Sequence, residues 1–383
     1  MYLDNKTYRR RRKRSPLPIV ILAIVIVLAA GYLANQRYEL LRNPFETPAP
    51  SPTPTRTTLS FIDEAQSYLD EGKVLEAAQT LQAVREREPD NDETRRQQAR
   101  LFIYASKYDD ALSAAKEAVA INPDDVRNQI ALAAALDWSN QYDDAYSTAQ
   151  LAVQMDPQSA EAHARLAEVL ADLGSWAQAV QEAETALELD PRNFEVLRIR
   201  GYTLEVQGHY TEALDFYQQA AELEPKLSFI YLIMGRNYRA LDKPVEAIAN
   251  FRKGLENAPD DPYLRFELGK TLFQVGDQEL GLRELRRAVE LKPDMPDAYQ
   301  QLGIGLYLRR AYEDAIANLE KAIELGNTSA LSYYIMGRSY LNLEEVDCVN
   351  AVPWLTKALE TDEDMIPAED ARDGITRCGE TPP

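Results

Sequence analysis

The chain has 383 residues, of which 45% are apolar, and its formal net charge is −20 at pH 7. Residues 1–43 contain nine Lys or Arg and two Asp or Glu, so the negative excess belongs to the rest of the chain. A nucleic-acid-binding protein is expected to present a basic face, so this composition argues against nucleic acid as a partner. The simpler interpretation is that acidic helix surfaces keep an extended protein soluble.

The N-terminal segment combines a basic tail with an apolar run. Residues 1–15 include six consecutive cations at 9–14, and the 18 residues from 17 to 34 are uncharged. Eighteen apolar residues are about the minimum for a helix that crosses a bilayer, so residues 16–35 are predicted to be a transmembrane signal anchor. The cations before this segment outnumber those just after it, which predicts a cytoplasmic N-terminus and an extracytoplasmic remainder in the cell membrane.

A cleaved signal peptide is the rival interpretation of this segment, and a third interpretation fits less well. A cleaved signal peptide would need a small-residue cleavage site, and Leu28, Ala29 and Ala30 match that pattern poorly. The arginine run also resembles a nuclear-targeting or nucleic-acid patch, but the apolar segment begins within two or three residues of it. Residues 36–58 follow as a juxtamembrane segment and a Pro/Thr/Ser-rich linker, a composition typical of an extended, hydrated tether.

From residue 59 onward the sequence repeats with a period of 34 residues. A small residue recurs at Ala65, Ala99, Ala133, Ala167, Gly201, Gly235, Gly269, Gly303 and Gly337. A proline recurs at Pro89, Pro123, Pro157, Pro191, Pro225, Pro259 and Pro293. Within each period, apolar residues recur at intervals of three and four, which predicts two amphipathic helices. The small residue leaves room for close helix approach, and the proline ends the second helix.

This pattern of a large residue, Leu–Gly/Ala, Tyr/Leu, then Ala–x3–Phe/Tyr/Leu and Pro resembles the tetratricopeptide repeat. The resemblance implies an all-α, right-handed α-solenoid of about nine helix-turn-helix repeats over residues 59–363. The residue after the proline is often Asp, as at Asp90, Asp124, Asp260 and Asp294, and we expect it to cap the next helix.

The ninth repeat is irregular, and both cysteines of the chain lie in or after it. About two residues are inserted between 344 and 350, and residues 364–383 are predicted to form a capping helix and tail. In an extracytoplasmic domain, Cys348 and Cys378 would pair and staple the cap onto the stack. Two unrelated buried thiols are the alternative, and a redox pair lacks the close CxxC spacing.

The chain offers no arrangement typical of catalysis. It has two histidines, His163 and His209, and no phosphate-binding, zinc-protease or nucleophile-elbow motif. We therefore expect no enzyme activity, catalytic residues, cofactor or metal, and no small-molecule substrate is evident.

The resemblance also implies a binding surface, because the first helices of tetratricopeptide repeats line a concave wall that receives a peptide or a helix. Carried over position by position to repeats five to nine, the wall residues are Arg198, Tyr202, Phe229, Arg236, Arg239, Tyr263, Phe266, Lys270, Phe273, Tyr307, Tyr334 and Arg338. Arginine and aromatic residues dominate binding energy at interfaces. The same positions in repeats three and four hold Asp137, Glu161 and Glu168, so the groove is expected to change sign along its length. The alternative is that these side chains pack or pair with neighbouring acids.

These features predict a non-catalytic, membrane-anchored scaffold or assembly factor that binds a partner protein or peptide through the concave face. The alternative is an accessory or regulatory subunit of a cell-envelope enzyme or transport complex.

Overall fold

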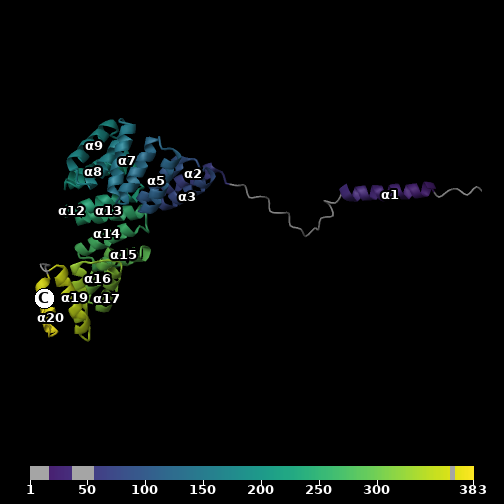
Figure 1. Ribbon diagram of the computed structural model, residues 1–383. Helices are drawn as coiled ribbons and strands as arrows, with labels where there is room; N and C mark the ends of the chain where they lie inside the picture. The colour runs from purple at the N-terminus through teal and green to yellow at the C-terminus, as the bar shows by residue number, and fades with distance from the viewer. Residues whose placement is uncertain (1–16, 37–55, 363–366) are drawn as a thin grey trace, which may run out of the picture. The chain divides into compact units, whose positions relative to one another are not determined.

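The computed structural model describes residues 17–36, 56–362 and 367–383, and the regular structure within them is helical throughout. The chain divides into two compact regions, Met1–Arg56 and Thr57–Pro383. The described part of the first region is essentially one helix, α1 (Leu17–Gln36) (Figure 1). A helix therefore forms where the sequence predicts one.

The membrane anchor predicted for residues 16–35 is not supported. Across the described residues, no helix is both long enough and apolar enough to span a membrane. The basic tail 1–15 and nearly all of the linker 36–58 lie outside the described residues.

The second region, Thr57–Pro383, is a stack of helix pairs followed by a terminal helix. The helix pairs are numbered here unit 1 to unit 9. The first helices are α2 (Thr58–Asp70), α4 (Asp92–Tyr104), α6 (Val126–Trp138), α8 (Ala160–Asp172), α10 (Phe194–Glu205), α12 (Ser228–Ala240), α14 (Pro262–Gln274), α16 (Pro296–Leu308) and α18 (Ala330–Leu341). The second helices are α3 (Val74–Arg87), α5 (Tyr108–Ile121), α7 (Tyr142–Met155), α9 (Trp176–Leu189), α11 (Tyr210–Leu223), α13 (Pro244–Asn257), α15 (Gln278–Leu291), α17 (Tyr312–Glu324) and α19 (Cys348–Thr361). The terminal helix is α20 (Ala368–Arg377). This arrangement confirms the predicted all-α repeat solenoid.

The turn between units differs by one residue from the prediction. Between α3 and α4, Pro89 and Asp90 form the turn, and Asn91 is the N-cap, with its side chain accepting from the backbone N–H of Thr94 at 3.0 Å. Asp125, Ser159, Asn193 and Asp261 cap the corresponding helices of later units. The prediction that Asp90, Asp124, Asp260 and Asp294 are caps is therefore wrong. The turn uses the proline and the residue after it, so the extended N-cap conformation falls one position later.

The recurring small residue is matched in size by a residue 16 positions later in units 2 to 8. Gly201 faces Tyr217, and a Cβ on Gly201 would lie 2.7 Å from the Tyr217 ring atom Cε1. Gly235, Gly269 and Gly303 face Phe251, Leu285 and Leu319 in the same way, and in unit 9 Gly337 faces Leu355, 18 positions later. Where the small residue is Ala99, Ala133 or Ala167, the later position holds Ala115, Ala149 or Ala183, all essentially buried. In units 2 to 8 glycine thus occurs where the second helix presents a large side chain, whereas unit 1 pairs Ala65 with Leu81.

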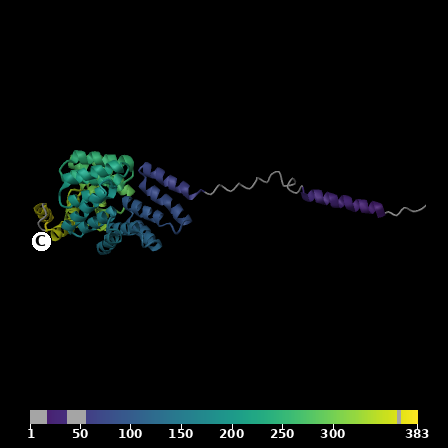
Figure 2. The ribbon, with the colours of Figure 1, turned by 90° about the horizontal axis from the view of Figure 1, so that it is seen from above.

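The first turn of the solenoid closes on itself. Ala65 and Leu81 of unit 1 share a buried cluster with Leu227 and Phe229 at the start of α12. Figure 1 and Figure 2 show α2 and α3 beside α12 and α13, far away in sequence. A Cβ on Gly72, in the α2–α3 turn, would lie 2.8 Å from the carbonyl oxygen of Asn257, so the backbones nearly touch.

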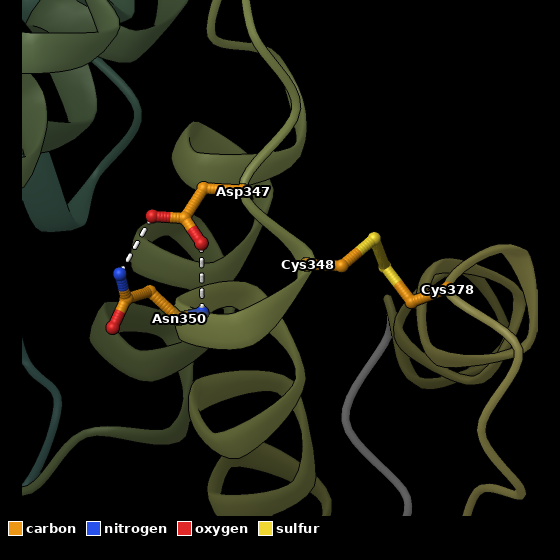
Figure 3. The surroundings of a disulfide bond; sticks show 4 residues. All are labelled: Asp347, Cys348, Asn350 and Cys378. Atoms are coloured by element: carbon orange, nitrogen blue, oxygen red, sulfur yellow. Dashed lines mark hydrogen bonds between the residues drawn. A yellow bond between two sulfur atoms is a disulfide. The ribbon is translucent and has the colours of Figure 1, made fainter.

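A short terminal helix closes the C-terminal end of the stack. Ala368, Ala371 and Ile375 of α20 are buried against α18 and α19, as the amphipathic pattern predicts. Cys378 at the end of α20 forms a disulfide with Cys348, with their Cα atoms 5.6 Å apart (Figure 3). Cys348 begins α19 rather than lying in the inserted loop, and Asp347 caps that helix by accepting from the Asn350 backbone N–H at 3.1 Å.

Candidate binding surface

First helices of neighbouring units contact one another directly from α4 to α10 and from α12 to α18, as the inner wall of a superhelix requires. The predicted wall residues lie on these helices but differ in accessibility. Arg198, Phe229 and Phe266 are buried, with at most 9% of each residue exposed. Arg236 is exposed. The remaining members are half-buried: Tyr202, Arg239, Tyr263, Lys270, Phe273, Tyr307, Tyr334 and Arg338.

Arg198 belongs to a buried ion-pair network. Its Nη1 lies 2.8 Å from Glu168 Oε1, and its Nε lies 2.9 Å from Glu195 Oε2. Arg165 pairs with the same two carboxylates. Burial lowers the pKa of Arg198, but Glu168 and Glu195 more than offset this and hold the pKa well above its ordinary value. Arg198 therefore joins units 4 and 5 and has little surface for a partner.

Phe229 is also taken up by internal packing. Its ring centroid lies 5.8 Å from that of Tyr104 and 5.6 Å from that of Trp138. Tyr104 in turn lies edge-on to Phe194, at 6.1 Å. These four rings from units 2, 3, 5 and 6, named here the aromatic plug, join units that lie three or four repeats apart.

In units 6 and 7, two predicted arginines share one buried carboxylate. Glu267, only 4% exposed, accepts from Arg236 Nε at 2.9 Å and from Arg239. Although burial raises the pKa of Glu267, Arg236 and Arg239 lower it below its ordinary value. The Arg236 side chain is still 45% exposed, so it remains accessible while paired.

Three aromatic members of units 7 and 8 are half-buried. Tyr263, Phe273 and Tyr307 pack against one buried cluster. The ammonium of Lys270 lies 5.8 Å from the ring centroid of Phe266, and within the described residues Lys270 has no ion pair. Arg236, Lys270 and these three rings are named here the central groove.

At the C-terminal end, the predicted residues contact the cap. Tyr334 donates a hydrogen bond to Asp370 of α20 at 2.6 Å, and Arg338 pairs with the same carboxylate at 3.0 Å.

The change in the sign of the groove's charge that was predicted for units 3 and 4 is wrong for two of its three acids. Glu168 lies between Arg165 and Arg198, and Asp137 is 3% exposed, so neither carboxylate faces a partner.

The sequence-based analysis missed a cavity of about 290 Å³ on the inner side of α4, α6, α8 and α10. Five arginines line it: Arg96, Arg100, Arg127, Arg165 and Arg198. The sequence contains a signal for two of these arginines, though not for the cavity, because Arg96 and Arg100 occupy the same repeat positions as Arg198 and Tyr202, three periods earlier. Wall residues were predicted only for units 3 to 9, so Arg96 and Arg100 of unit 2 were not among them.

A sequence profile described as the tetratricopeptide repeat matches residues 62–126, 164–227, 234–296 and 266–332, more than half of the chain. A second tetratricopeptide profile matches residues 102–153. The chain belongs to the tetratricopeptide repeat family. Members of this family typically act as non-catalytic scaffolds for protein binding, and their stacked units create an extended concave surface.

Solved structures share the tetratricopeptide fold at low sequence identity. The APC/C hetero-tetramer Cut9–Hcn1 matches with a TM-score of 0.68 and 18% identity over 84% of this chain, which spans 63% of the matched chain. The human IFIT1 dimer with PPP-AAAA matches with a TM-score of 0.58 and 16% identity, over 84% of this chain and 82% of that one. YrrB, a TPR protein with an unusual peptide-binding site, matches 48% of this chain at 22% identity and a TM-score of 0.39, covering 95% of its own. No curated protein matches this tetratricopeptide chain in sequence.

Proposed function

We propose that this tetratricopeptide protein is a non-catalytic scaffold that binds an acidic segment of a partner protein through the central groove. The observation that carries the proposal is that the first helices α12, α14 and α16 carry two accessible cations, Arg236 and Lys270, and the half-buried rings of Tyr263, Phe273 and Tyr307. Aromatic and cationic side chains of this kind supply most of the binding energy at protein interfaces. The two cations give the groove a preference for carboxylates.

The proposal is tested by neutralising the two accessible cations, Arg236→Gln with Lys270→Gln, and leaving Arg239 to hold the buried Glu267. The matched control is Arg252→Gln with Arg286→Gln, because these arginines are exposed on the second helices α13 and α15. Chemical crosslinking in native extracts should capture the same partner with the parent and the control, and lose it with the groove variant. Capture of one partner by all three proteins, each with an unchanged circular dichroism spectrum, would end the proposal.

We further propose that the solenoid works in an extracytoplasmic compartment. The Cys348–Cys378 disulfide supports this placement, because disulfides persist in oxidising compartments. Attachment to the cell membrane with a cytoplasmic N-terminus rests on the sequence of residues 1–35 alone. Thiol labelling in intact cells, with and without prior reduction, tests the compartment, and extraction of membranes with alkaline carbonate tests the attachment. Freely reactive cysteines before reduction would contradict the extracytoplasmic compartment. Release of the full chain by carbonate would contradict the attachment to the membrane.

A further inference from the structure

The cavity in the first turn has walls from four consecutive first helices, α4, α6, α8 and α10. Tyr104 at the end of α4 donates a hydrogen bond to Glu195 at the start of α10, which joins the two outer walls. Tyr104 also belongs to the aromatic plug, in which Phe229 is only 9% exposed.

Most of the charges on the walls are satisfied internally. Arg96 pairs with Glu93 and lies 3.6 Å from Asp125. Arg127 pairs with the same Asp125, at 2.6 Å. Arg165 and Arg198 share Glu168 and Glu195, as described above.

Arg100 is the exception among the five arginines. Within the described residues its guanidinium has neither a hydrogen bond nor an ion pair, although it is exposed and lines the cavity. Desolvation by the surrounding walls lowers the pKa of Arg100, but Tyr104, Glu195 and Glu161 raise it above its ordinary value. Arg165, which is 6% exposed, has a buried Nε atom without a hydrogen-bond partner among the described residues. Among the described residues, Arg100 and Arg165 on the cavity walls thus have N–H groups without a hydrogen-bond acceptor.

The rest of the lining is partly polar and partly apolar. Glu93, Glu161 and Glu195 also line the cavity, and they interact with Arg96, Asn193 and Arg198 respectively. The apolar part consists of the aliphatic side chains of Ile103, Ile130, Ala131 and Ala134 and the aromatic face of Trp138. Pockets for small molecules combine apolar walls with a few polar groups that fix orientation, and a volume of about 300 Å³ is at their lower limit.

We propose that the cavity binds a small organic anion, a carboxylate or phosphate on a compact apolar body, with Arg100 as the partner of the anionic group. Arg100 is the unpaired, reachable donor, and the apolar walls bury the body of the ligand. This site is distinct from the central groove, and binding here requires no protein partner. The two proposals therefore succeed or fail independently.

Isothermal titration calorimetry of the full chain tests the site with benzoate and phenyl phosphate as the two anionic probes. Benzyl alcohol serves as a neutral probe of similar size, and all titrations use the same ionic strength. The main variant is Arg100→Gln, and the matched control is Arg252→Gln, an exposed arginine on α13 remote from the cavity lining. Ala131→Leu is a second variant, which adds volume to the half-buried α6 wall.

At least one anion should bind the parent and Arg252→Gln equally. Its affinity should fall roughly tenfold or more in Arg100→Gln, as expected for loss of a charged hydrogen bond. Ala131→Leu should abolish binding while keeping the helical spectrum, and benzyl alcohol should bind more weakly than either anion. Preference for benzoate or phenyl phosphate identifies the anionic group. Absence of binding by both anions, or equal affinity in Arg100→Gln and the parent, would overturn the proposal.

Discussion

The hydroxyl of Tyr104 in unit 2 donates a hydrogen bond to Glu195 in unit 5, 91 residues further along the chain. In a solenoid most contacts join neighbouring units, so stability is close to a sum of local terms. The Tyr104–Glu195 bond and the aromatic plug instead join units three or four repeats apart. The first turn therefore resembles a closed ring more than an open spiral, and the cavity lies inside that ring.

Tyr104→Phe should destabilise the first turn by about 1.5 to 3 kcal/mol, because it removes a hydrogen bond to a buried carboxylate and keeps the ring contacts. Tyr142→Phe is the control, since the Tyr142 hydroxyl donates to exposed Asn140, and its effect should stay within about 0.5 kcal/mol. Hydrogen exchange of α4 and α10 amides, measured beside urea unfolding, checks both. Equal effects of the two changes would show that the closure contributes nothing.

Asp137 should give the protein an unusual loss of stability as the pH rises. Burial, followed by Glu168 and Asp172, raises the pKa of Asp137 to about 9 from an ordinary value of 3.8. The folded state therefore holds a proton that the unfolded state releases, so this group's contribution falls as the pH rises from about 4 to about 9. Asp137→Asn mimics the protonated carboxyl and should remove this dependence, on the order of 1 kcal/mol per pH unit. Urea midpoints at pH 6 and pH 8.5 check it, and parallel changes in parent and variant would refute it.

Gly303 and Leu319 should be strongly coupled. Gly303→Ala places a Cβ 2.7 Å from Leu319 Cγ, so we expect a loss of about 1 to 3 kcal/mol from overpacking. In a Leu319→Ala background the same change recreates the Ala–Ala pair of units 2 to 4, so Gly303→Ala should then be neutral or stabilising, by up to about 1 kcal/mol. A double-mutant cycle measures the difference. Additive effects would mean that the size match is incidental.

Arg198 and Arg236, predicted from the same repeat pattern, should behave differently. Arg198→Ala leaves Glu168 and Glu195 buried with fewer partners, so we expect a loss of about 3 to 5 kcal/mol. Arg236→Ala removes a half-exposed pair from Glu267, which keeps Arg239, and should cost about 1 kcal/mol or less. Thermal unfolding of the two variants side by side decides the matter. A larger loss for Arg236→Ala would invert the assignment of structural and accessible arginines.

Removing the disulfide should loosen the C-terminal cap. Replacing both Cys348 and Cys378 with serine opens a loop of 30 residues, and the chain-entropy model assigns such a bond about 3 to 4 kcal/mol. Amides of α20 should exchange faster in the variant, while those of units 2 to 5 keep their rates. Reductant should change the exchange of α20 in the parent and leave the variant unaffected. Protection of α20 that is equal in all samples would contradict this role.

The repeat architecture could be predicted from sequence because its contacts are local and periodic. A small residue such as Gly201 or Gly235 packs against the second helix of its own unit, so one period of 34 residues contains both partners of the contact. Contacts such as Tyr104–Glu195 and Trp138–Phe229 depend on the twist accumulated over several units. No local pattern contains that sum, so the closed first turn and its cavity were not predictable.

The binding surface was predicted only in part, for a related reason. Repeat position identifies which helix face a residue occupies, but burial depends on what the neighbouring unit presents there. Arg198 pairs with Glu168 and is buried in an ion-pair network, whereas Arg236 pairs with Glu267 and keeps nearly half of its side chain exposed. The helix caps show the same limit at smaller scale, because one residue of turn geometry separates Asp90 from the cap at Asn91.

A stack of similar interfaces has no intrinsic length, since each end offers the surface that another unit would cover. Helix α20 occupies that surface at one end, with Ile375 turned inward and Glu369 and Asp373 exposed. A second molecule meeting this end encounters carboxylates where it would need aliphatic side chains. We therefore expect the disulfide-bonded helix to disfavour end-to-end association of the solenoid at its C-terminal end.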